Sequence, residues 1–237
     1  MHKPILRITS LAVFASFAIS GETLSARAQQ PATLYPAMAP LDQYLIADKA
    51  SEIALARSAA PNSISAGAEV LVLGRHGYET AVKGTNGFVC MVMRSWTDLI
   101  DDPDFWNPKQ RAPICLNAAA ARTYLPFNIM KTNLVLAGKS KPQMFDAIKL
   151  ALDKGELKPI EPGAMSYMMS KQQYLNDSAK SWYPHVMIFA SHTSAKDWGA
   201  DATDSPIFEA DDTSDRLVIF MFPVGKWSDG SNAPPMH

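Results

Sequence analysis

Three short apolar runs separated by glycine-containing turns constrain the fold of this 237-residue chain more than any other feature. The runs occupy residues 68–73, 78–83 and 88–93, and the segments between them read Gly-Arg-His-Gly and Gly-Thr-Asn-Gly. Glycine and Asn-Gly supply the positive φ angles that tight hairpin turns need. The pattern therefore predicts an antiparallel three-strand meander.

Helical segments lie on both sides of these runs. A helix is expected over residues 42–60 and ends before Pro61, because proline disfavours the helical conformation in the residue that precedes it. Ser140 and Gln143 form a capping box for a later helix with an apolar stripe, and Gly155 is placed to cap its end.

Two later apolar runs, residues 186–190 and 217–222, predict buried strands. Strands followed by helices and then by strands again favour an α+β fold. We therefore expect a single domain over residues 41–230. Its mostly antiparallel sheet combines the N-terminal three-strand meander with the two C-terminal strands and is covered by helices. Residues 29–40 are expected to form an exposed leader and residues 231–237 a flexible tail.

The N-terminus has the layout of a secretory signal peptide. Lys3 and Arg7 precede a short apolar core at residues 11–19, and Ala26-Arg-Ala28 supplies small residues before a cleavage site. Cleavage near Ala28 predicts an exported protein, located in the periplasm or outside the cell. The alternative, a retained anchor helix, is disfavoured because the apolar run is short.

Charge and hydropathy argue against two classes of protein, those that bind nucleic acid and those that span a membrane. Removal of the predicted signal peptide, residues 1–28, takes away three basic residues and one acidic residue and changes the net charge from -1 to -3. A chain without a basic excess is not expected to bind nucleic acid. No later stretch reaches the roughly 18 consecutive apolar residues that a spanning helix needs, so we expect no membrane span in the mature chain.

The two cysteines, Cys90 and Cys115, both follow the predicted cleavage site. An even pair in an exported chain most simply forms a disulfide. The alternative is that Cys90 is a nucleophilic thiol, but its apolar neighbours would raise the pKa of the thiol, the wrong direction for a nucleophile. We therefore expect a Cys90–Cys115 disulfide.

Four segments carry a resemblance to known proteins. They are GTNGFVCMVMR at residues 84–94, PHVMIF at 184–189, DWG at 197–199 and VGKWSDG at 224–230. Together they make the chain resemble a group of uncharacterised exported bacterial proteins, and the similarity extends over most of the mature chain. The resemblance implies export and a self-contained domain, and it implies no particular activity.

No local signature of a nucleotide site, a serine hydrolase or a zinc protease is present, and the sequence indicates no cofactor. A catalytic site can still be assembled from distant residues. His185 would then act as a general base together with a carboxylate such as Asp197 or Asp201. The simpler alternative is that His185 is a hydrogen-bonded histidine at the edge of the core.

Two kinds of metal site can be considered from ligand types. His185, Met168 and Met187 offer the soft nitrogen and thioether ligands that suit Cu(I), although methionine is also ordinary core material. The aspartates within residues 98–104 and 197–204 offer oxygen ligands for Ca²⁺. Neither segment matches a calcium-loop pattern, and solvated polar loops explain both equally well.

Tryptophans in predicted loops and at strand ends are candidates for ligand binding. Aromatic side chains near aspartates can line a groove for a sugar or a peptide, and the alternative is that they cap the core. The candidates are Trp96, Trp106, Trp182 and Trp198.

The leading hypothesis is a non-catalytic exported domain that binds a small ligand or another envelope protein. It follows from the missing catalytic signatures and from aromatic and acidic loops on a disulfide-linked sheet. One alternative is a secreted hydrolase with a His/carboxylate site around His185. Another is a metal carrier that uses methionine and histidine.

Overall fold

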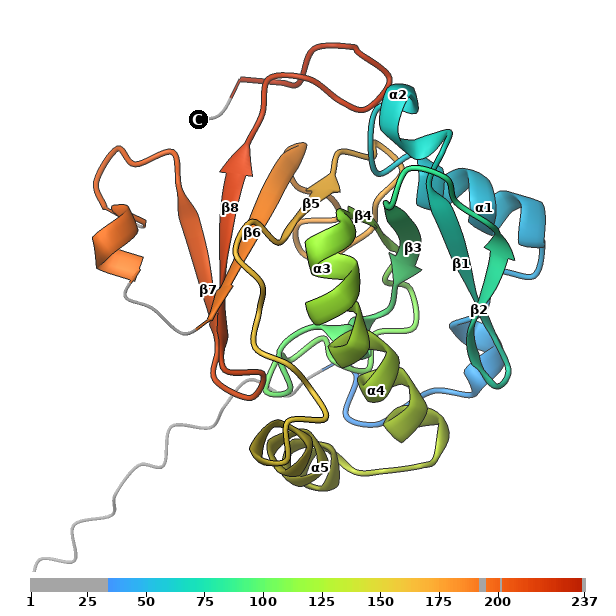
Figure 1. Cartoon of the computed structure of the whole chain (residues 1–237). Coiled ribbons are helices and arrows are strands. Elements are labelled where there is room, and N and C mark those ends of the chain that lie inside the picture. Colours follow the sequence, from blue (N-terminus) through green and yellow to red (C-terminus); the bar gives the residue numbers. More distant parts are fainter. Residues whose placement is uncertain (1–33, 192–194, 201, 236–237) are drawn as a thin grey trace, which may run out of the picture. The chain divides into compact units, whose positions relative to one another are not determined.

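A computed structural model of the chain describes residues 34–191, 195–200 and 202–235. It contains one eight-stranded sheet with the strand order β2-β1-β3-β4-β5-β6-β8-β7 (Figure 1). The strands are β1 (Glu69–Gly74), β2 (Gly77–Val82), β3 (Val89–Met93), β4 (Ala112–Leu116), β5 (Met165–Met168), β6 (His185–Ser191), β7 (Phe208–Asp212) and β8 (Leu217–Pro223).

The α-helices are α1 (Lys49–Arg57), α2 (Asn62–Ser65), α3 (Ala118–Thr123), α4 (Leu125–Leu136) and α5 (Lys141–Asp153). Three short 3-10 helices are η1 (Leu41–Gln43), η2 (Ser95–Thr97) and η3 (Ala195–Trp198). The predicted α+β fold with a mostly antiparallel sheet is confirmed, since all strand pairs except β1–β3 are antiparallel. No helix within the described ranges is long and apolar enough to cross a membrane.

The predicted meander is wrong in its third strand. β1 and β2 form the expected hairpin, in which Gly74 pairs with Gly77, but β3 pairs with the other edge of β1 and runs parallel to it. The chain crosses the start of β1 at Gly84, where an added Cβ would lie 2.2 Å from the main-chain nitrogen of Glu69. Glycine therefore permits a short crossing that the hairpin pattern did not reveal.

Cys90 and Cys115 are direct register partners on β3 and β4, and they form the predicted disulfide, with their Cα atoms 4.0 Å apart. The two predicted C-terminal strands are also present, as the adjacent antiparallel strands β6 and β8. β4, β5 and β7 lie outside the predicted strands. They complete the sheet between and beside the predicted ones.

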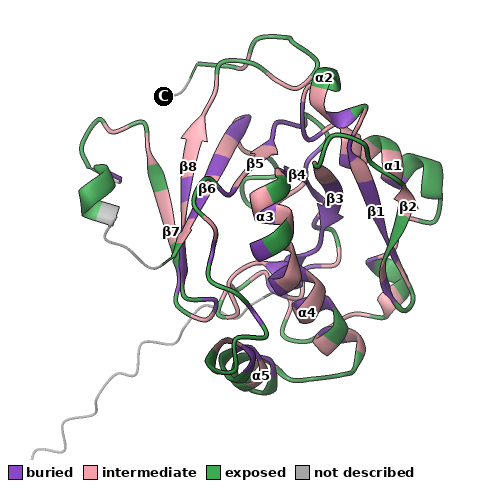
Figure 2. Cartoon of the chain, viewed as in Figure 1, coloured by how far each residue is buried: buried purple, intermediate pink, exposed green. Residues whose placement is uncertain are grey.

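Two apolar cores lie on opposite faces of the sheet, because successive side chains of a strand point to opposite sides. On β3, Cys90 and Val92 face α1, while Met91 and Met93 face the core under α3 and α4. Figure 2 shows the buried residues concentrated in the middle strands of the sheet, away from the edge strands β2 and β7.

The helix expected over residues 42–60 is interrupted. Asp48 is the N-cap of α1, and its carboxylate accepts hydrogen bonds from the main-chain N–H groups of Ala50 and Ser51. Aspartate favours a cap over a helix interior, which explains why the helix begins there. At α5 the predicted capping box is confirmed: Ser140 Oγ accepts from the Gln143 N–H, and Gln143 returns a bond to the Ser140 N–H.

A buried ion pair joins α1 to the end of β3. Arg94 Nη2 donates to Glu52 Oε1 at 2.9 Å, and both side chains are almost completely shielded from solvent. Arg94 Nε also donates to the Tyr44 carbonyl oxygen at 2.7 Å. The Tyr44 ring packs on Trp96, with ring centroids 4.7 Å apart. This network holds the segment before α1 against the sheet.

The described parts of the predicted leader and tail make specific contacts. In the leader, the Tyr35 hydroxyl donates to the Asp177 carboxylate, and the Ala39 N–H donates to the Tyr44 hydroxyl. In the tail, the Ala233 N–H donates to the carbonyl oxygen of Gly225. The predicted signal peptide, residues 1–28, lies outside the described residues.

The disulfide should contribute measurably to stability, because it restricts the unfolded chain by joining residues 25 positions apart. We expect the double variant Cys90→Ala/Cys115→Ala to lose about 3 kcal/mol in the free energy of unfolding, measured by urea denaturation. A reductant should shift the wild-type curve similarly and leave the double variant unchanged. Coincident curves for oxidised and reduced wild-type protein would contradict this expectation.

Candidate functional site

A cavity of about 320 Å³ lies over the β4–β8 part of the sheet. One side of it is apolar and comes from strand residues together with Tyr124 and Trp182. The other side is acidic and comes from the loop between η2 and β4 and from the end of β7. Its acidic lining residues are Asp98, Asp102, Asp104 and Asp212.

Strand register builds the apolar side. Met168 on β5 lies opposite His185 on β6, and Met187 on β6 lies opposite Met221 on β8. His185 and Met187 are two residues apart, so they project from the same face of the sheet. All four side chains line the cavity. These side chains form the wall of the cavity and leave its interior open.

His185 is held in one orientation. Its Nδ1 lies 2.7 Å from the Tyr183 carbonyl oxygen, and we assign the proton to Nδ1 as the donor. Its ring packs edge-on against Trp182, with centroids 4.7 Å apart. Burial lowers the pKa of His185 to about 4, so the imidazole is neutral at pH 7. Nε2 consequently carries a lone pair rather than a proton.

The acidic side centres on Asp98, which directly follows η2. Gln110 Nε2 donates to Asp98 Oδ2 at 2.6 Å. Gln110 itself is only 2% exposed, and its Oε1 has no hydrogen-bond partner among the described residues. The Asp104 N–H donates to Asp102 Oδ1, which turns this loop along the cavity. Two acceptor side chains, Asp98 and Gln110, therefore line the same wall.

Burial raises the pKa of Asp98 to about 7. The negative charges of Asp102 and Asp104 raise it further, whereas the hydrogen bond from Gln110 and the charge of Lys131 act in the opposite direction. Asp98 can therefore exchange a proton near neutral pH, and it is sensitive to any charge placed in the cavity.

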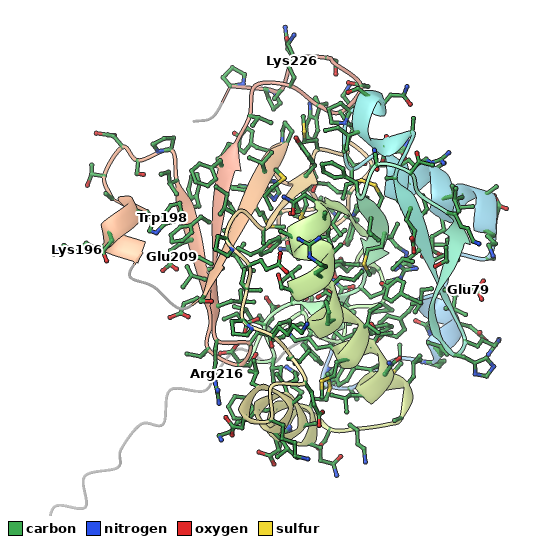
Figure 3. The ribbon with its side chains drawn as sticks, in the orientation of Figure 1. Glu79, Lys196, Trp198, Glu209, Arg216 and Lys226 are labelled. Atoms are coloured by element: carbon green, nitrogen blue, oxygen red, sulfur yellow. A yellow bond between two sulfur atoms is a disulfide. The ribbon has the colours of Figure 1, made fainter. Side chains whose placement is uncertain are left out.

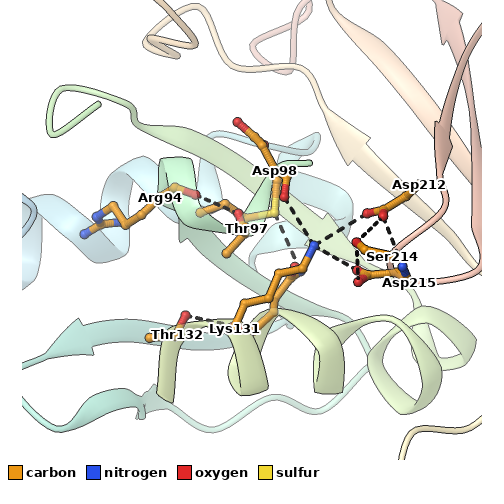
Figure 4. A network of polar contacts seen from close by, with 10 residues as sticks. Arg94, Thr97, Asp98, Lys131, Thr132, Asp212, Ser214 and Asp215 are labelled. Carbon is orange, nitrogen blue, oxygen red and sulfur yellow. Dashed lines mark hydrogen bonds and ion pairs between the residues drawn. The ribbon is translucent and has the colours of Figure 1, made fainter. Parts of the chain in front are cut away.

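Behind the acidic side, Lys131 on α4 forms a buried network (Figure 4). Its Nζ lies 2.9 Å from Asp215 Oδ2 and 3.5 Å from Asp212 Oδ2, and it donates to the Asp98 carbonyl oxygen at 3.2 Å. The Ser214 hydroxyl donates to Asp212 Oδ1 at 2.6 Å. The network fixes the β7–β8 turn and the Asp98 loop to α4.

The pKa values of this network follow from its burial. Burial alone would lower the pKa of Lys131, but the carboxylates of Asp215 and Asp212 outweigh it, and the net shift is upward. The pKa of Asp215 is raised by burial, although the charge of Lys131 opposes the rise. Lys131 is therefore a fixed positive charge that is already engaged by two carboxylates.

The structure brings some predicted site residues together. His185, Met168, Met187 and Trp182 all line the cavity. Trp96 is instead fully buried in the core and donates from Nε1 to Thr132 Oγ1 at 3.0 Å.

Three further predicted positions lie away from the cavity lining. Trp106 packs edge-on against Phe105, and Trp198 on η3 stacks on Phe220, beside β7 and β8 (Figure 3). Asp197 is exposed on η3, whereas Asp201 falls outside the described residues.

The part of the chain that the structure describes contains no cluster of acidic side chains arranged to bind a metal ion. Within those ranges, no group of three or more His, Cys, Asp or Glu residues could hold a metal ion. Of the aspartates considered as Ca²⁺ ligands within residues 98–104, Asp98, Asp102 and Asp104 line the cavity, and Gln110 bonds to Asp98.

Sequence reasoning missed Lys131, Asp215 and Gln110. A signal existed for Lys131, because it is the single charge in the otherwise uncharged α4 sequence LPFNIMKTNLVL. A lysine surrounded by apolar positions on a helix is almost never buried unless it is paired. Its partners, Asp212 and Asp215, lie more than 80 residues away, and nothing in their local sequence identifies them.

No protein-family model, curated protein or solved structure matches this chain.

Replacing Asp98 with asparagine should stabilise the protein at pH 8. In the folded protein the pKa is about 7, above its unfolded value of about 3.9, so ionisation of Asp98 opposes folding increasingly from pH 4 to pH 7. We expect Asp98→Asn to gain about 1 kcal/mol or more at pH 8 and nothing near pH 4, measured by thermal unfolding. Asp101→Asn, on the exposed side of the same loop, is the control. An equal gain at both pH values would contradict the assignment.

Removal of the Lys131 charge should be severe, because it leaves two buried carboxylates without a counter-charge. We expect Lys131→Met to lose about 3–5 kcal/mol of unfolding free energy. The exposed pair Lys149–Asp153 provides the matched control, and Lys149→Met should lose less than about 1 kcal/mol. Urea denaturation of both variants measures the difference, and similar losses would show that the buried network is unimportant for stability.

Proposed function

We propose that this protein binds a small molecule with apolar and polar parts in the cavity beside His185, without converting it chemically. The cavity itself carries the proposal. Its volume of about 320 Å³ lies at the lower end of the range of small-molecule sites, and its lining combines apolar side chains with a few convergent polar groups. The Cys90–Cys115 disulfide supports an exported location for this activity.

The surroundings of His185 favour binding over hydrolysis. The hydrogen bond of its ring within the described residues goes to the Tyr183 carbonyl oxygen, whereas a general base needs a nucleophile within reach. Two side chains of the lining carry a hydroxyl, Thr97 and Tyr124. The Thr97 hydroxyl donates to the Arg94 carbonyl oxygen at 2.7 Å, and burial raises the pKa of the Tyr124 phenol, which makes it a poor nucleophile. Of the two carboxylates considered as partners of His185, Asp197 is exposed on η3, and Asp201 lies outside the described residues.

A soft-metal carrier is the second candidate function. It is favoured by the position of His185 between Met168 and Met187, all three on one face of the sheet and all lining the cavity. The Nδ1 bond to a main-chain carbonyl would leave Nε2 available for a metal, as in many metal-binding histidines. Cu(I) is the ion that these ligand types suit.

Ligand binding can be tested by thermal unfolding of the purified, oxidised protein with a panel of small organic compounds and with Cu(I). A ligand at 100 times its dissociation constant adds about 2.7 kcal/mol, which corresponds to about 5–10 °C for a chain of this size. The variant Ala210→Trp would fill the cavity from β7 and should abolish the shift. Ala50→Trp, on the exposed start of α1, should retain it.

Each result separates the candidates. A shift with an organic compound that Ala210→Trp abolishes supports the proposal. A shift with Cu(I) alone that is lost in Met187→Leu favours the carrier instead. Shifts that Ala210→Trp leaves intact, or no shift with any compound, would overturn the proposed use of this cavity. If no compound shifts the unfolding temperature, an envelope protein becomes the candidate partner.

A further inference from the structure

The acidic wall of the cavity contains an acceptor that nothing in the described chain satisfies. Gln110 is 2% exposed and lines the cavity, and its Oε1 has no hydrogen-bond partner. Its amide orientation is fixed, because Nε2 donates to Asp98 Oδ2 at 2.6 Å. A buried acceptor without a donor is costly, and this oxygen is itself shielded and joined to Asp98 through the amide of the same side chain. The wall therefore has more acceptors than donors, and Asp98 is the acceptor that a ligand in the cavity would meet.

The charges around Asp98 also favour a ligand that donates hydrogen bonds over one that accepts them. Asp98 shares the cavity lining with the titratable groups of Asp102, Asp104, Tyr124, His185 and Asp212, and Lys131, with its partner Asp215, adjoins them. Among these, Lys131 is the cation, since His185 is neutral. Lys131 bonds to the carboxylates of Asp212 and Asp215 and to the main chain of Asp98. The Asp98 carboxylate therefore lacks a positive partner of its own.

The apolar residues of the cavity lining suit the apolar part of a ligand whose polar part meets the acidic wall. Met168, Met187 and Trp182 present apolar and aromatic surface there. At about 320 Å³ the cavity has the volume of about ten water molecules in the liquid, enough for one or two rings or a short alkyl chain. Flexible methionine side chains can adjust to the shape of such a ligand, and an aromatic ring offers it a large apolar surface.

We propose that the ligand is an organic cation: a protonated primary amine donates to Asp98, while its apolar body lies against Met187 and Trp182. The inference rests on the proposed function, because it assigns the chemical class of the molecule that occupies that same cavity. An ammonium group supplies up to three donors and a positive charge, and it matches the excess of acceptors and of negative charge on the wall.

Binding of such a cation is linked to a proton. In the empty site the Asp98 carboxyl has a pKa of about 7, and an ammonium partner stabilises its ionised form. The amine therefore binds with release of a proton below pH 7. Its affinity should rise about tenfold from pH 6 to pH 8, because the carboxyl is mostly protonated at the first pH and mostly ionised at the second. His185, with a pKa of about 4, remains neutral throughout this window.

Isothermal titration calorimetry with matched compounds tests the inference. We suggest three amines with their neutral hydroxyl analogues: phenethylamine with 2-phenylethanol, tryptamine with tryptophol, and hexylamine with hexanol. 3-Phenylpropionate is the anionic comparison. At pH 8 at least one amine should bind tenfold or more tightly than its alcohol and the carboxylate. Its affinity should fall about tenfold at pH 6.

Two variants locate the effect. Asp98→Asn should remove both the preference for the amine and the pH dependence, whereas Asp101→Asn, on the exposed part of the same loop, should retain both. A pH dependence that persists in Asp98→Asn would overturn the assignment of the proton to Asp98.

The outcomes separate this inference from the proposed function. If alcohols bind as tightly as amines and Ala210→Trp abolishes both, the cavity binds small molecules but the inference of a cation is wrong. Preferred binding of 3-phenylpropionate would overturn it in the same way. If none of the seven compounds binds at millimolar concentration, the inference fails, and the wider panel described above decides the proposed function separately.

Discussion

The ammonium group of Lys131 holds together three segments that are far apart in the sequence: helix α4, the loop that starts at Asp98, and the β7–β8 turn. Two of these segments, the Asp98 loop and the β7–β8 region, contribute Asp98 and Asp212 to one wall of the cavity, and Figure 4 shows both joined to Lys131 on α4. Because a buried charge is tolerated only when it is paired, the lysine and its two carboxylates must come together for the chain to fold. The position of the acidic wall follows from this requirement.

Two different kinds of surface meet around the cavity. On one side, the register of β5, β6 and β8 places methionines and His185 on a single face of the sheet. On the other side, the Asp98 loop contributes the carboxylates of Asp98, Asp102 and Asp104, while Lys131 pairs with the carboxylates of the β7–β8 turn. The site thus combines an adaptable apolar surface with a wall that favours positive charge.

Local sequence patterns predicted those features that depend on neighbouring residues. The β1–β2 hairpin and the capping box at Ser140 are of this kind, because each is determined by a few consecutive side chains. The disulfide was predictable for a different reason, since two cysteines allow only one intramolecular pairing. Asp48, which begins α1 in place of a longer helix, carried a capping signal that apolar periodicity obscured.

The sequence by itself determined the α+β class, the strand segments of the hairpin and of β6 and β8, and the pairing of the cysteines. Only the tertiary structure decided that β3 lies parallel to β1, that Trp96 belongs to the core while Trp182 lines a cavity, and that Lys131 meets Asp212 and Asp215. The physical reason is the distance in sequence between the residues that interact. Hydrogen bonds of turns and caps join residues close in sequence, whereas burial and charge pairing depend on which distant segments meet.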